Sequence, residues 1–247
     1  MNLWEQLKEH TQARIGLHRI GHAISTKELL EFKLAQAFAH DAVQETWDVQ
    51  RFRMALEKIG EKPLMVNSEV SSRDQYLKYP NLGRLLDEPS RSQLFNYAQM
   101  HSVDIAFIAT DGLSPKGIDN HMISLWKTLK TLLGKKLDDL KLALVVVPFG
   151  RVAISDEIGS ALNAKASVIF VGERPGLSSF DSLGIYMTYN PRHGNTDANR
   201  NCISNIHPPE GLSYVSASEK LVDLLRESFR MKLSGVNLKE IERNMLG

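Results

Sequence analysis

The residue with the clearest capacity for binding chemistry is Glu173, which directly follows an apolar run at 166–172. That run predicts a buried strand, and the turn-forming sequence Glu-Arg-Pro-Gly begins abruptly after it. In open α/β sheets, ligands bind at this edge, beyond the carboxyl ends of the strands. Glu173 is therefore predicted to accept hydrogen bonds from a ligand. The alternatives are that it caps a helix, pairs with Arg174, or only turns a surface corner.

Two further loops follow predicted strands, at Thr110–Ser114 and Pro148–Ser155. Short, right-handed connections would bring both loops to the same edge of the sheet as the loop at 173–179. Val152, in the second loop, can offer a ligand an apolar wall and its backbone groups. Its alternative role is ordinary core packing.

Cys202 is the only cysteine in the chain. A lone cysteine can be a catalytic nucleophile, but no histidine–acid pair stands in its local sequence to activate it. Cysteine is also a small, adaptable apolar side chain. Close packing or a backbone contact is therefore the predicted role of Cys202.

Several motifs of known enzyme classes are missing from the sequence. No Gly-x-Gly-x-x-Gly follows a predicted strand, and no phosphate-binding Gly-x-x-x-x-Gly-Lys-Ser/Thr occurs. The cysteine and the scattered histidines lack the spacing of zinc ligands. A dinucleotide fingerprint, a P-loop nucleotidase and a zinc centre are thus excluded, and no metal site is predicted.

From residue 101 onward, apolar strands alternate with helices, which predicts a sheet covered on both faces. Strands are expected at 105–109, 142–147, 166–172 and 184–189. Helices are expected over 118–132 with an end at Gly134, from Ser155, and from a capping box at Ser216–Glu219 to Gly235. The fold class is therefore α/β. Residues 101–247 form a three-layer, Rossmann-like domain with a mostly parallel sheet.

Residues 1–100 are predicted to form a helical region. A capping box at Ser25–Glu28 opens a helix whose apolar residues Leu29, Leu30, Phe32 and Phe38 form a broad face. Apolar residues at helical spacing continue in the same helix or in a second one, which Gly60 and Pro63 end. Further short helices are expected at 73–79 and 92–100. The broad face exceeds what a small helical region can bury, so part of it is expected to contact a partner protein.

Composition limits the class of protein further. The chain has 247 residues, of which 43% are apolar, and 30 basic residues balance 29 acidic ones. Nothing in this balance favours nucleic acid or an anionic membrane as a partner. No apolar run approaches the length of a membrane span, the N-terminus is not a secretory signal, and a single cysteine suits the cytosol.

The segments at 171–184 and 200–211, together with 150–159, 11–15 and 25–32, resemble the small subunit of ethanolamine ammonia-lyase. The resemblance covers nearly the whole chain. It implies a carbon–nitrogen lyase that converts ethanolamine to acetaldehyde and ammonia through the deoxyadenosyl radical of adenosylcobalamin. It also implies a hetero-oligomer in which the large subunit holds the substrate, and a cytoplasmic location, within a bacterial microcompartment.

Carried over residue by residue, the resemblance assigns the cobalamin contacts of this chain to Val152, Glu173 and Cys202. The cofactor would remain base-on, with its own dimethylbenzimidazole on cobalt, so no protein histidine is required. His121 lies in Asp119-Asn-His-Met-Ile-Ser124, which lacks the glycine of the cobalt-binding Asp-x-His-x-x-Gly motif, and packing explains it better.

The alternative is a non-catalytic corrinoid- or nucleotide-binding module that acts as a carrier or assembly partner, because this fold hosts many functions. The sequence departs from the family in its short N-terminus, in the link at 189–196 and in the tail Lys239–Gly247.

Overall fold

The apolar strands build one six-stranded sheet. A computed structural model describes residues 3–11, 13–136 and 139–238, so the tail Lys239–Gly247 lies outside the described residues. The strands of this sheet, in spatial order, are β3 (Leu64–Met65), β5 (Leu142–Val146), β4 (Ile105–Thr110), β6 (Ala166–Gly172), β7 (Leu183–Tyr189) and β8 (Arg200–Ile206). The α/β class predicted from the sequence is confirmed.

The chain order within the sheet creates a topological switch point at β4. Strands β3, β5, β4 and β6 are mutually parallel, and β4 lies between β5 and β6. From β4 the chain goes first to β5 on one side and then to β6 on the other side. Because the three strands are parallel, the loops after β4, β5 and β6 all lie at the same edge of the sheet. Strands β7 and β8 then complete the sheet in antiparallel order.

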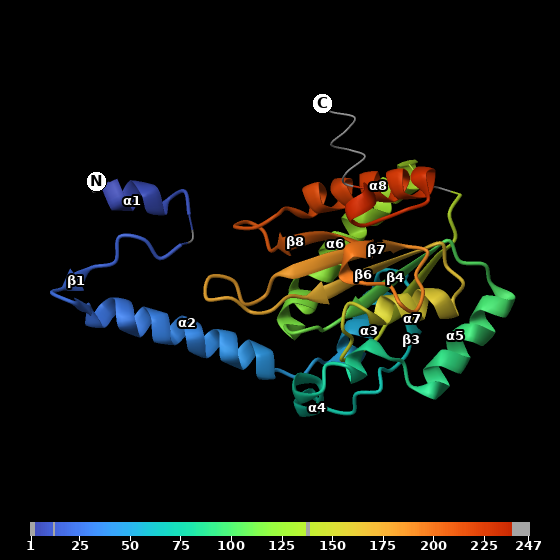
Figure 1. Cartoon of the computed structure of the whole chain (residues 1–247), viewed down its shortest axis with the longest axis horizontal. Helices are drawn as coiled ribbons and strands as arrows, with labels where there is room; N and C mark the ends of the chain where they lie inside the picture. The colour runs from blue at the N-terminus through green and yellow to red at the C-terminus, as the bar shows by residue number, and fades with distance from the viewer. Residues whose placement is uncertain (1–2, 12, 137–138, 239–247) are drawn as a thin grey trace.

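Helices cover both faces of the sheet, as Figure 1 shows. One face carries α3 (Val49–Lys58), α6 (Pro115–Lys136) and α8 (Tyr214–Met231), and the other carries α5 (Glu88–Met100) and α7 (Ile154–Ala161). Every residue of β4 and β6 is buried. This double cover is the reason that these strands are apolar throughout and do not alternate.

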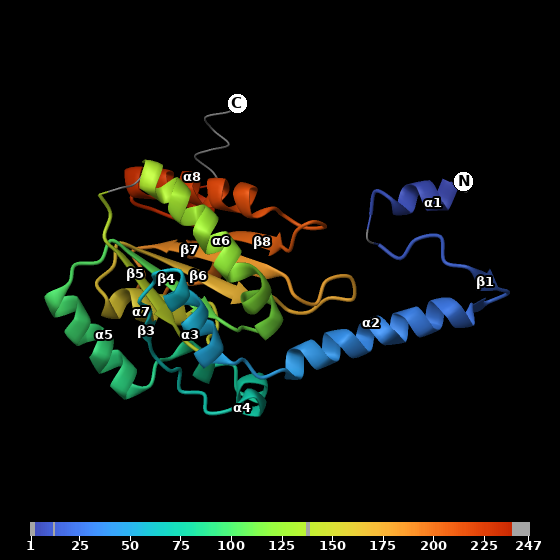
Figure 2. The same cartoon turned by 180° about the vertical axis from the view of Figure 1, so that it is seen from behind.

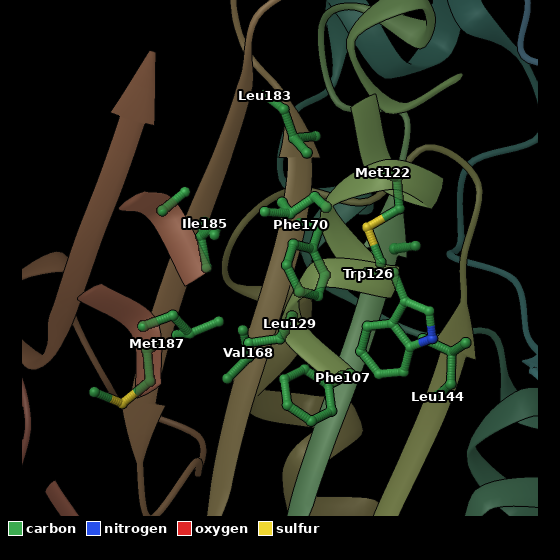
Figure 3. Close-up of a cluster of buried hydrophobic side chains, with 14 of the residues drawn as sticks. Phe107, Met122, Trp126, Leu129, Leu144, Val168, Phe170, Leu183, Ile185 and Met187 are labelled. Atoms are coloured by element: carbon green, nitrogen blue, oxygen red, sulfur yellow. The ribbon is translucent and has the colours of Figure 1, made fainter. Parts of the chain in front are cut away.

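The larger core lies between the sheet and the pair α6 and α8. Figure 3 shows Trp126 of α6 beside Phe107 of β4 and Phe170 of β6. The Trp126 ring meets each phenyl ring edge-on, at centroid distances of 5.1 Å and 6.3 Å. Such edge-to-face aromatic pairs stabilise a core by about 0.5–1.5 kcal/mol beyond their buried area.

An N-terminal arm projects from this body (Figures 1 and 2). The arm consists of α1 (Leu3–Lys8), the hairpin of β1 (Arg19–Ile20) and β2 (Ala23–Ile24), and α2 (Thr26–Gln44). The remaining short elements, which lie between α2 and β4, are α4 (Arg73–Lys78) and the 3₁₀ turn Leu82–Arg84; a second 3₁₀ turn, Asp197–Asn199, precedes β8.

Residues 47–100, although expected to belong to a helical region, pack on the sheet. Trp47, Phe52 and Leu56 join the core beside α6, and β3 pairs with β5. These residues are therefore part of the packed α/β body, whereas the division of the chain into domains at residue 100 stays a prediction. The two-residue strands of this region went unpredicted because they carry no periodicity.

The predicted start of α2 is confirmed, although its cap differs in detail, and the predicted ends of two other helices are wrong. At α2, Ser25 Oγ accepts from the Glu28 amide, but the Ser25 amide donates to the His18 carbonyl, so only half of the capping box forms. Helix α8 is capped by Ser213, one turn before the predicted box, and it ends at Met231 because Lys232 adopts left-handed geometry. Helix α6 continues past Gly134 to Lys136.

Candidate functional site

The three strand-end loops meet at the carboxyl edge, and a buried ion pair fixes their geometry. Asp111, which directly follows β4, is fully buried, and its Oδ2 lies 2.9 Å from Arg73 Nη1 of α4. Arg73 also donates to the carbonyls of Gly112 (2.7 Å) and Leu113 (3.0 Å). The Phe149 amide donates to Asp111 Oδ1 at 2.6 Å. The loops after β4 and β5 are therefore locked together.

A groove runs along this edge on the side of α7. Its first part, of about 430 Å³, is lined by Leu113, Arg151, Val152, Glu173 and Tyr186, among others. Its second part, of about 490 Å³, shares Arg151, Val152 and Tyr186 and extends to Arg84 and Arg200. The two parts adjoin along these shared residues. We call the whole the edge groove.

Glu173 lies across the end of β7 because Gly184 leaves room for it. A Cβ at Gly184 would lie 2.8 Å from Glu173 Oε1. Glu173 Oε2 accepts from the amide of Asn205 in β8, at 3.2 Å. Among the described residues, Oε1 accepts no hydrogen bond. Glu173 thus neither caps a helix nor pairs with Arg174: it joins β8 to β6 and keeps one oxygen for a further donor.

Tyr186 connects the three residues singled out in the sequence. It lines both parts of the edge groove with Val152, and it lies directly opposite Cys202 in the β7–β8 ladder. Opposed residues of an antiparallel pair point to the same face of the sheet. Burial is the main cause that raises the pKa of the Tyr186 hydroxyl, and the neighbouring Cys202 side chain is the second. Tyr186 therefore stays neutral beside any ligand.

Two of the three predicted site residues lie in the same cavity, and the third does not. Val152 and Glu173 line one cavity, whereas exposed Cys202 lies one strand away, past Tyr186. Arg151 and Tyr186 were missed. The sequence could have indicated Arg151, because it is a cation in a strand-end loop next to Val152. Nothing in the sequence distinguishes Tyr186 from the other residues of its strand.

His121 lies elsewhere, in α6, and is buried. Its Nδ1 lies 2.9 Å from Tyr214 Oη, and its Nε2 lies 3.5 Å from Asp181 Oδ2. This placement agrees with the packing role expected for it. Within residues 3–11, 13–136 and 139–238, no group of three histidine, cysteine or acidic side chains is arranged to hold a metal ion.

The fold and the groove define a doubly wound α/β protein with a groove at its switch point, which is where such folds bind ligands. A family model described as ethanolamine ammonia-lyase light chain matches residues 1–239. The small subunit of that enzyme from Xanthomonas campestris is 44% identical over 247 residues, with 99% of this chain and 90% of the relative covered. The Ralstonia nicotianae small subunit is 45% identical over 242 residues, covering 97% and 88%. The chain therefore belongs to the ethanolamine ammonia-lyase small-subunit family.

None of the helices in the described part of the chain is long and apolar enough to cross a membrane.

The buried carboxyl group of Asp111 should give stability a distinct pH dependence. Burial raises its pKa to about 6, despite Arg73, so between about pH 4 and pH 6 the folded state keeps a proton that the unfolded chain has released. Its contribution to stability therefore falls as pH rises through that window. We expect the free energy of unfolding of the wild type, minus that of Asp111→Asn, to fall from pH 4 to pH 6.5 in urea titrations. A flat difference contradicts this; the exposed Asp74→Asn is the control.

Proposed function

We propose that this chain is the small subunit of an ethanolamine ammonia-lyase that converts ethanolamine to acetaldehyde and ammonia with adenosylcobalamin. It would act as a carbon–nitrogen lyase only in a hetero-oligomer with the large subunit. The observation that carries this proposal is the identity of 44–45% with named small subunits over nearly the whole chain. We also propose a cytoplasmic location, within a bacterial microcompartment.

The residues of the edge groove suit a corrinoid, which combines an apolar ring with peripheral amides. Val152 and the Tyr186 ring offer apolar surface, while Glu173 Oε1 is an acceptor without a donor among the described residues. Arg151 Nε is a buried donor without an acceptor there. Unsatisfied polar groups of this kind favour a ligand that completes them.

We assign the cobalamin contacts to Val152, Glu173 and Cys202. Glu173 would accept a hydrogen bond from a corrin side-chain amide, Val152 would contribute its side chain and backbone, and Cys202 would pack against the cofactor. Bound adenosylcobalamin, base-on, would supply the radical that abstracts hydrogen from the substrate. This chain would contribute no catalytic residue: its role would be to orient the cofactor and to exclude water.

The arm is the surface we assign to the large subunit. Its exposed large apolar residues lie on α1, β2 and α2, and they are Leu3, Trp4, Leu7, Ile24, Leu29, Leu30, Phe32, Leu34 and Phe38. Leu30 is 61% exposed and Phe38 is 53% exposed. Exposed apolar surface on this scale is typical of an interface. The end of α2 is fixed to the body by Arg73, which donates to the Val43 carbonyl at 2.7 Å.

Reconstitution tests the division of labour. The chain alone should release no ammonia from ethanolamine, because the substrate site lies on the partner. Mixing it with its large subunit should produce activity that depends on added adenosylcobalamin. Ammonia release by the isolated chain at a comparable rate would contradict the proposal. Corrinoid or nucleotide binding without activity in the mixture would favour the non-catalytic module instead.

Removal of Glu173 tests the sharpest residue assignment. A hydrogen bond to a charged group contributes about 1.5–3 kcal/mol, so Glu173→Ala should weaken adenosylcobalamin binding roughly 10- to 150-fold. Glu173→Gln, which keeps an acceptor, and Cys202→Ser should each cost less. The dissociation constant is measured on reassembled complexes whose subunit association is intact.

Gly184→Ala is a second, independent test of the position of the Glu173 carboxylate, because its Cβ would displace the carboxylate without deleting it. It should also weaken cofactor binding. Should Glu173→Ala bind cofactor like the wild type, the carboxylate serves only the Asn205 amide.

Deletion of residues 1–45 tests the arm. The variant should keep the α/β body folded, because the core residues begin at Trp47 apart from Ala42. It should bind the large subunit more weakly, because it loses the apolar face. Circular dichroism and titration of the large subunit check these two results. Association with unchanged affinity would show that the arm is not the interface.

A further inference from the structure

Three arginines around Val152 lack counter-charges, unlike several arginines elsewhere in the fold. Arg73 pairs with Asp111, Arg91 with Glu157, and Arg200 with Asp156. By contrast, Arg84, Arg151 and Arg174 line the edge groove and form no ion pair with any described carboxylate. The acidic residues that also line it are Glu173, and Asp197, which lies 3.7 Å from Arg200. The groove therefore has an excess of positive charge.

Arg151 is held in place before any ligand binds. Its side chain passes over Gly83, where a Cβ would lie 2.9 Å from Arg151 Cγ. Its guanidinium stacks at 4.1 Å from the centre of the Tyr76 ring, and its Nη2 donates to the Tyr76 carbonyl at 3.0 Å. A guanidinium that is already oriented loses little entropy when it binds an anion.

Backbone donors lie next to this guanidinium. Val152 and Ala153 line the second part of the groove, just before α7, and their amides donate to no acceptor among the described residues. Both precede the positive end of the α7 dipole. Two free amides beside two unpaired guanidiniums form the kind of cradle that binds phosphate oxygens.

We propose that Arg84, Arg151 and the amides of Val152 and Ala153 bind a phosphodiester. This inference rests on the proposed function, because adenosylcobalamin has one phosphodiester, in the loop that connects its corrin ring to dimethylbenzimidazole. The second part of the groove, of about 490 Å³, has room for such a group, and it adjoins the part that holds Glu173. A free nucleotide has the same phosphate chemistry and is separated from the cofactor by the test below.

The test compares Arg151→Gln with wild type in the complex with the large subunit. Two ligands are used: adenosylcobalamin, and adenosylcobinamide, which lacks the phosphodiester and the nucleotide. Loss of a charge-assisted hydrogen bond should raise the dissociation constant for adenosylcobalamin about 10- to 150-fold. The constant for adenosylcobinamide should stay within about twofold. Arg226→Gln, an exposed arginine of α8, is the matched control.

Phosphorus NMR of the bound cofactor gives a second readout that does not depend on cobinamide affinity. The phosphodiester resonance should differ between wild type and Arg151→Gln. Equal losses for both ligands, or no loss for either, would overturn the assignment, as would identical resonances. If the wild type binds no adenosylcobalamin but binds adenosine monophosphate in an Arg151-dependent way, the proposed function fails while the phosphate site remains.

Discussion

Arg73 is the residue on which the geometry of the site depends. A buried guanidinium must satisfy its donors, and those of Arg73 reach Val43 at the end of the arm and Asp111, Gly112 and Leu113 in the loop after β4. Asp111 in turn accepts from Phe149, which has a positive φ of 57°. A single network therefore fixes the arm, the switch-point loop and the loop that presents Arg151 and Val152.

At this edge of the sheet, some charged side chains are paired and others are not, and the difference follows their location. The fully buried charges are paired, as the cost of desolvation requires. The described cations without ion pairs include Arg84, Arg151 and Arg174, which line the groove, where we propose that a ligand replaces the missing acid. Glu173 shows both behaviours, since one oxygen binds the Asn205 amide and the other is available. One carboxylate thus has a structural role and can also have the ligand-binding role that we propose for it.

The two parts of the chain bury their apolar residues differently. The body buries Trp126, Phe107 and Phe170 in its own core, whereas the arm leaves Leu30 and Phe38 exposed. In the described part of the chain, helix α2, with 19 residues, projects away from the sheet, and its Phe38 ring meets Phe180 at a centroid distance of 6.2 Å. Most of its apolar residues remain exposed. Burial of its apolar face therefore requires another surface, which is the physical reason to regard this chain as one subunit of a larger assembly.

The amino-acid sequence was sufficient to predict most of the buried strands, the helices between them and the α/β class. Doubly covered strands must be apolar throughout, and abrupt polar turns mark their ends. The sequence also singled out Glu173 and Val152 as ligand contacts, because they lie just beyond such strands. The structure places both in the lining of one cavity, and their contact with a ligand stays a prediction. The sequence did not indicate β8, where Arg200, Asn201 and Cys202 give no strand pattern, or the two-residue β3.

Which of these residues meet depends on how the elements pack in three dimensions. The pairing of β7 with β8 places Tyr186 opposite Cys202, and the absence of a side chain at Gly184 lets Glu173 reach Asn205. The lack of an ion pair between Arg151 and any described carboxylate is likewise a property of packing. Such contacts join residues that are far apart in the sequence, and local periodicity contains no information about them.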